Sequence, residues 1–208
     1  MIVWICNYLG VFKKFKVKMK VLHECYYFHN NFQGSVRDIG KIYDGWYKKI
    51  PKIGRKIMKE GIGRFSFFCF DNPNDLVNPN DFRFCLGILI SKKYQDEELA
   101  EVLIKGGLQK VELPKSNSFS VSFPYKGECS YRIQTIKAWK ALSNYSHSKK
   151  DHPSNKGIFG GYIEICNKVR IECHIPDDNF EKFYITKLPP PKLKSNKRIK
   201  TDESLKND

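Results

Sequence analysis

The chain has 208 residues, of which 41% are hydrophobic and 14% aromatic, a composition typical of one globular domain and not of a disordered protein. Its 37 basic and 22 acidic side chains give a formal net charge of +15, which favours an anionic membrane surface or nucleic acid as a partner. Seven cysteines occur singly and without a Cys-x-x-Cys pair, which argues against a disulfide framework or a zinc site. We expect no metal and no other cofactor.

Residues 1–12 form an uncharged apolar run that ends at a cluster of lysines. A helix needs about 20 apolar residues to cross a bilayer, so this run is too short to span one alone. Three interpretations stay open: the remainder of a truncated membrane anchor, an interfacial anchor with Trp4 and Tyr8 at headgroup depth, or a first buried segment. The lysines suited to an anionic membrane surface are Lys13, Lys14, Lys16, Lys18 and Lys20.

A strand of alternating apolar and polar residues, a glycine and an amphipathic helix follow one another twice along the chain. In the first unit the strand begins at residues 16–21 and continues through 26–28, and in the second it lies at 118–123. Twelve residues separate the glycine that opens each helix from a tryptophan within it, and these pairs are Gly34 with Trp46 and Gly127 with Trp139.

Two further apolar strands are expected after each helix, at residues 65–70 and 82–90 and at residues 162–166 and 169–175. The repeat predicts an α+β fold in which two β-α-β-β halves are related by a pseudo-two-fold axis. Their strands form one antiparallel sheet with the helices on one face. The halves comprise about 13–92 and 108–186, and a short helix at 96–105 links them. The alternative is two unrelated α+β segments with a coincidental spacing.

Glu164 is the residue whose chemistry least suits its predicted environment. A two-residue turn at 167–168 would put Glu164 opposite Ile171, on an apolar face of the strand pair. A carboxylate there is costly unless it is paired, protonated or exposed to a water-filled cleft. A one-residue change in the turn would place Glu164 beside Arg170 instead, so a structural salt bridge and a ligand-binding acid both stay open.

Four short motifs lie at compatible spacing within residues 13–186: Phe70-Asp71-Asn72-Pro73 with Pro79 and Arg83, Phe123-Pro124-Tyr125, Tyr162-Ile163-Glu164-Ile165, and Phe183-Tyr184-Ile185. Together with the repeat they resemble the gyrase-inhibitor-like, or bacterial effector-binding, family, and within it the reticulophagy receptors of animals. The resemblance implies a ligand cleft between the halves into which Glu164 looks. Tyr125, Trp46 and Trp139 would line or support that cleft, although the tryptophans also suit the core.

The resemblance implies a non-enzymatic, cytosol-facing adaptor at the endoplasmic reticulum membrane that acts in turnover of this organelle by autophagy. Its partner would be an autophagy ubiquitin-like protein, but the basic tail at 187–208, which we expect to be disordered, has no aromatic-x-x-aliphatic motif. Such patterns occur only in the apolar N-terminal run and inside predicted elements. Two alternatives stay open: a soluble protein that binds a small cationic or apolar ligand, and a nucleic-acid-associated adaptor, in the cytosol or the nucleus.

Overall fold

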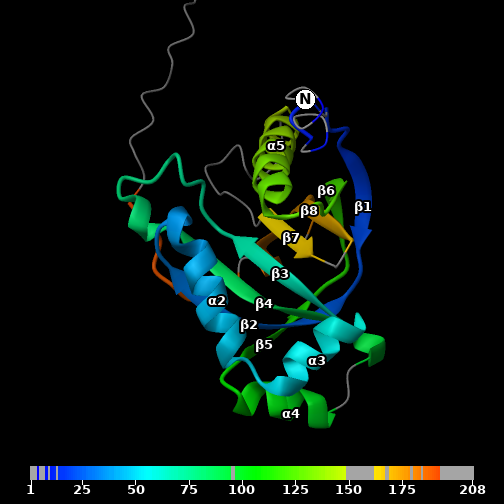
Figure 1. Ribbon diagram of the computed structural model, residues 1–208. Helices are drawn as coiled ribbons and strands as arrows, with labels where there is room; N and C mark the ends of the chain where they lie inside the picture. Colours follow the sequence, from blue (N-terminus) through cyan, green and yellow to red (C-terminus); the bar gives the residue numbers. More distant parts are fainter. Residues whose placement is uncertain are drawn as a thin grey trace, which may run out of the picture.

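Eight antiparallel strands form one sheet, with helices packed on one of its faces (Figure 1). The computed structural model describes residues 4, 8, 10–12, 14–94, 97–148, 162–166, 169–178, 180–183 and 185–192. The strands are β1 (Lys18–Leu22), β2 (Cys25–Gln33), β3 (Gly63–Cys69), β4 (Arg83–Ser91), β5 (Gln109–Leu113), β6 (Ser116–Pro124), β7 (Tyr162–Cys166) and β8 (Arg170–Pro176). The α-helices are α2 (Ile39–Lys49), α3 (Lys52–Glu60), α4 (Glu97–Lys105) and α5 (Glu128–His147). Short 3₁₀ turns lie at η1 (Val36–Asp38), η2 (Pro79–Asp81), η3 (Lys92–Tyr94) and η5 (Phe180–Phe183).

The order of the strands confirms the predicted internal repeat. Across the sheet the order is β1-β6-β8-β7-β3-β4-β2-β5. Exchanging β1 with β5, β2 with β6, β3 with β7 and β4 with β8 turns this order into its own reverse, as a pseudo-two-fold axis requires. The two halves therefore meet where β3 pairs with β7 at the centre of the sheet. The α+β class, the β-α-β-β halves and the placement of helices on one face are confirmed.

The first strand of each half is bent into two pieces, which the sequence pattern did not predict. β1 pairs with β6 of the other half, whereas β2 pairs with β4 and β5, and the chain turns between them at His23 and Glu24. The second half repeats this arrangement, because β5 pairs with β2 while β6 pairs with β8 and β1. Each half thus contributes its first strand to the outer edge of the other half, in addition to the pairing of β3 with β7 at the centre of the sheet.

Helix α3 is a second correction, since the sequence analysis expected one helix between Gly34 and the strand at residue 65. Pro51 precedes this helix, and Gly61, with a φ of 78°, ends it in the left-handed conformation that favours glycine. Ile53 and Ile57 lie four residues apart and turn toward the core, so the helix covers the sheet with its apolar side. Its other side carries the basic residues Lys52, Arg55, Lys56 and Lys59.

The larger hydrophobic core lies between the helices and one face of the sheet. Trp46 and Ile50 of α2, Leu103 of α4 and Leu142 of α5 are buried in it. The opposite face of the sheet is covered by the C-terminal segment, where Phe183 is 2% exposed. The α-helices of the described residues therefore cover the face of the sheet that carries the larger core.

The C-terminal segment is held by polar contacts as well as by packing. Arg83 at the start of β4 donates three hydrogen bonds to the carboxylate of Asp71, and its Nη1 donates to the carbonyl of Leu188 over 3.2 Å. The backbone N–H of Val77 donates to the carbonyl of Lys192 over 3.0 Å. The first residues of the basic segment from 187 therefore contact the domain, and the predicted tail beyond residue 192 lies outside the described residues.

Candidate ligand site at the junction of the halves

Glu164 lies on β7 where the two halves meet, and only 1% of its surface is exposed. Cys166 pairs with Ile171 and Glu164 pairs with Cys173, so the register is shifted by two residues from the one predicted. Because side chains alternate along a strand, a shift of two residues keeps Glu164 on the apolar face that it shares with Ile171 and Cys173. Of the two facings that the sequence left open, Glu164 has the apolar one, and its partner is Cys173 instead of Ile171. The turn residues 167–168 lie outside the described residues.

The Glu164 carboxyl accepts one hydrogen bond, from the hydroxyl of Tyr131 on α5, over 2.6 Å. Burial raises the pKa of Glu164 above its ordinary value of 4.5, and the neighbouring hydroxyls of Tyr131 and Tyr162 partly oppose this shift. The Tyr162 hydroxyl is itself buried without a hydrogen-bond partner within the described part of the chain, and it lies near enough to lower the pKa of the carboxyl. No lysine, arginine or histidine in the described ranges lies within ion-pair distance of Glu164.

Three cysteine thiols share this environment with the carboxyl. Burial, followed by the negative charge of Glu164, raises the pKa of Cys69, Cys166 and Cys173. A raised pKa keeps a thiol protonated, and a protonated thiol is neither a nucleophile nor a metal ligand. The cysteines therefore act as small apolar side chains around Glu164. The described residues contain no cluster of side chains that could hold a metal ion.

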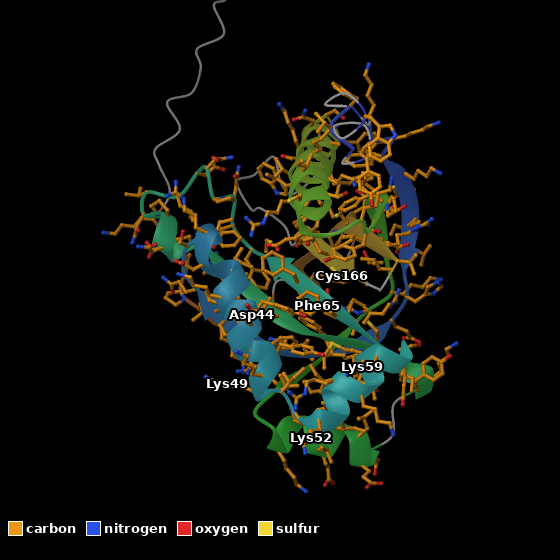
Figure 2. The ribbon with its side chains drawn as sticks, viewed as in Figure 1. Asp44, Lys49, Lys52, Lys59, Phe65 and Cys166 are labelled. Carbon is orange, nitrogen blue, oxygen red and sulfur yellow. The ribbon has the colours of Figure 1, made fainter. Side chains whose placement is uncertain are left out.

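Half-buried aromatic rings form a border beside Cys166, two residues along β7 from Glu164, on the side of α2. Phe65 of β3 lies opposite Cys166 of β7, and Figure 2 shows these two side chains in the space between α2 and α5. The ring of Tyr43 meets Phe65 edge-on, with 4.9 Å between the ring centroids. Burial raises the pKa of Tyr43, and nearby Tyr47, Cys166, Asp44 and Tyr125 raise it further. Tyr125 after β6 is thus close to this aromatic border from the other half.

The structure separates the four predicted site residues. Glu164 is at the junction, and Tyr125, which is 46% exposed, lies near its border. Trp46 is 4% exposed, donates from Nε1 to Asn30 Oδ1 over 3.0 Å, and supports Phe65 from beneath at 5.7 Å between ring centroids. Trp139 is a partly buried residue of α5 that packs against the core, about 12 Å along the helix axis from the residue that bonds to Glu164.

The sequence analysis missed Tyr131, Tyr162 and Tyr43. Tyr162 could have been predicted, because it lies two residues before Glu164 on the same strand and therefore on the same face. Tyr131 and Tyr43 come from helices, and their approach to the sheet depends on how α5 and α2 cross it. No local pattern in the sequence encodes that crossing.

The aromatic-x-x-aliphatic patterns other than the one in the apolar N-terminal run lie in ordered elements, as predicted. Tyr47 to Ile50 ends α2, Trp139 to Leu142 lies in α5, and Tyr162 to Ile165 lies in β7, which has a partner strand on both sides. Within the described ranges, no helix is both long enough and apolar enough to cross a bilayer. The contact with an autophagy protein and the placement at the reticulum membrane therefore stay predictions.

Comparisons with known proteins give similarity in structure alone. No protein-family model matches the sequence, and no curated protein matches it either. The C-terminal domain of EcmrR is 13% identical, with 78% of this chain and 96% of that chain covered and a TM-score of 0.44. An integron cassette protein from the mobile metagenome of Vibrio cholerae is 11% identical, with coverages of 78% and 96% and a TM-score of 0.47. A protein solved with bound tetraphenylphosphonium is 10% identical, with coverages of 80% and 96% and a TM-score of 0.43. Values this low do not transfer a ligand or an activity.

Proposed function

We propose that this chain is a non-enzymatic small-molecule-binding domain whose ligand is an organic cation held at Glu164. The observation that carries the proposal is a fully buried carboxyl with a single hydrogen-bond donor and no cationic partner among the described residues. A buried carboxylate in such surroundings must either keep its proton or receive a positive charge from outside the chain. An organic cation supplies that charge.

Asp71 is a buried acid of the same chain with a cationic partner, and it provides a comparison for Glu164. It is 5% exposed, and Arg83 satisfies it with hydrogen bonds from the backbone N–H, Nε and Nη2. Glu164 is more deeply buried, yet it receives one bond from a neutral phenol. Buried charges that serve stability alone are normally paired, as Asp71 is. The difference between the two acids supports a binding role for Glu164.

The surroundings suit a bulky, weakly hydrated cation. Tyr131, Tyr162 and Phe67 present aromatic surface near the carboxyl, and cations are attracted to the faces of aromatic rings. Since Glu164 is almost completely covered, a ligand has to displace the half-buried ring of Tyr131 before it meets the carboxylate. The hydroxyl of Tyr162, which is without a partner in the described structure, is available to a ligand that enters.

Isothermal titration calorimetry with tetraphenylphosphonium, a bulky cation used here as a probe, tests the proposal. Replacing Glu164 with Gln keeps the shape of the side chain and removes its charge, so we expect affinity to fall about thirtyfold, the equivalent of about 2 kcal/mol. Glu97→Gln on the exposed side of α4 removes the same charge far from the junction and is the matched control. Equal affinity of the Glu164 and Glu97 variants, or equal binding of a neutral probe of the same size, contradicts the proposal.

A second candidate, a membrane-surface adaptor of the reticulophagy-receptor type, is supported by the N-terminal segment. Trp4 is 70% exposed and stacks on Tyr8 at 5.8 Å between ring centroids, and Phe12 is 62% exposed. Exposed aromatic rings followed by lysines are typical of segments that lie at a lipid headgroup region. Cosedimentation with phosphatidylserine vesicles that is lost in Trp4→Ser/Phe12→Ser favours this candidate, and cosedimentation unchanged by these substitutions refutes it.

A further inference from the structure

A pocket of about 470 Å³ opens beside α3, apart from the Glu164 site, and it is lined by one tyrosine and four basic side chains. The lining residues are Tyr47, Lys52, Arg55, Lys56 and Lys59. Figure 2 shows Lys52 and Lys59 on α3, with Lys49 at the adjoining end of α2. Pockets of roughly 300 to 1,000 Å³ hold small organic ligands. The volume is therefore that of a small-molecule site with a strongly positive wall.

The positive wall is unfavourable for the helix that carries it. Lys52, Arg55, Lys56 and Lys59 lie three, four and seven residues apart, so they share one side of α3, and like charges at such spacings destabilise a helix. The first turn of α3 contains no acidic residue, although acids there would favour the helix dipole. The charge arrangement costs helix stability, and an anion bound over it would remove that cost.

The acids near the pocket leave most of this charge uncompensated. Lys56 Nζ lies 3.9 Å from Glu60 Oε1, at the limit of an ion pair. Lys52, Arg55 and Lys59 have no carboxylate within ion-pair distance in the part of the chain that the structure describes. Asp44 lies on α2 one turn before Tyr47, and it forms no ion pair with the pocket residues in that part of the chain. Three basic groups therefore remain available to an anionic ligand.

We propose that this pocket binds a small organic or inorganic polyphosphate. Phosphate groups match the lining, because a guanidinium bonds two phosphate oxygens at once and each ammonium adds a point charge. One phosphate cannot neutralise four basic groups, so the wall fits two or more linked phosphates. The ring of Tyr47, at the edge of the lining, offers a surface on which the organic part of a nucleotide stacks.

The test is titration of the full chain with ATP and with inorganic tripolyphosphate, followed by calorimetry. Arg55→Gln/Lys59→Gln removes two charges from the pocket, and Lys18→Gln/Lys140→Gln removes two exposed charges from β1 and α5 as the matched control. Saturable binding of one polyphosphate per chain, weakened about tenfold or more in the pocket variant alone, is the expected result. Preference for ATP over tripolyphosphate identifies a nucleotide site, and the reverse identifies an inorganic polyphosphate site.

Several results overturn the inference. Equal weakening by both double variants means that net charge, and not the pocket, attracts the anion. Binding only to duplex DNA, or only to phosphatidylserine vesicles, assigns the positive wall to a macromolecular surface instead. Thermal melts check folding, and the pocket variant should melt no lower than the parent chain because it relieves repulsion along α3. Cation binding at Glu164 is measured separately, so failure of either site leaves the other testable.

Discussion

The protonation of Glu164 gives the sharpest test of the candidate ligand site. Its carboxyl is 1% exposed and has one phenolic donor, and burial raises its pKa above 4.5. Above this pH the unfolded chain has released the proton, while the folded chain holds it until the pH passes the raised pKa. The folded state then binds more protons than the unfolded state, so the contribution of Glu164 to stability declines as the pH rises through this window.

The expected slope is at most about 1.4 kcal/mol per pH unit, the value for one proton. Glu164→Gln has no such proton, and its free energy of unfolding lacks this decline. The variant should therefore gain stability relative to the parent chain as the pH rises from 4.5 toward the raised pKa of Glu164, and the gain should level off above that pKa. Urea unfolding, monitored by tryptophan fluorescence at each pH, gives the free energy of unfolding of the variant and of the parent chain. The contributions of the other titrating groups cancel in the difference between the two free energies.

The partner residue provides the internal control. Tyr131→Phe removes the hydrogen bond that favours the charged carboxylate, so the pKa of Glu164 should rise further and the decline in stability should extend to higher pH. In the double variant Tyr131→Phe/Glu164→Gln this dependence should vanish. The reasoning is refuted if the gain in the free energy of unfolding of Glu164→Gln over the parent chain stays constant with pH or shrinks as the pH rises.

Two further predictions concern the frame around the site. Asp71→Asn removes the carboxylate charge that pairs with the buried guanidinium of Arg83 and should lower the free energy of unfolding by about 3 kcal/mol, measured by urea denaturation; a loss comparable to that of a surface substitution contradicts this role. Gly87→Ala would place a methyl group 2.5 Å from the backbone of β2 and should cost about 3 kcal/mol. A methyl group added by Gly45→Ala in α2 meets nothing within 4 Å, so this variant should instead stabilise the fold by about 0.5 to 1 kcal/mol. If the melting temperatures of both glycine variants shift in the same direction, this account of the packing is wrong.

The sequence was sufficient for the repeat because its signals occur twice. The matched spacing of Gly34 with Trp46 and of Gly127 with Trp139 identified the halves, and alternation along the strands identified their faces. The exchange of β1 and β5 between the halves was not predictable, because a bent strand and a straight strand share the same alternation. Helix α3 was missed although Pro51 marked its start, because its short basic segment lies between a stronger helix pattern and a stronger strand pattern.

The candidate site was harder to predict than the fold, because the residues that form it occur only once in the sequence and not in both halves. The pseudo-two-fold axis places β3 against β7, yet the residue opposite Glu164 on β3 is Phe67, so the junction holds a single acid beside an apolar ring. Its hydrogen-bond donor, Tyr131, lies 33 residues away in the chain, a separation over which no periodicity connects two side chains. A single carboxylate balances one positive charge. A ligand with one cationic centre and an apolar body therefore matches the junction, whereas a dication of the same size would bury its second charge against Phe67 and should bind more weakly.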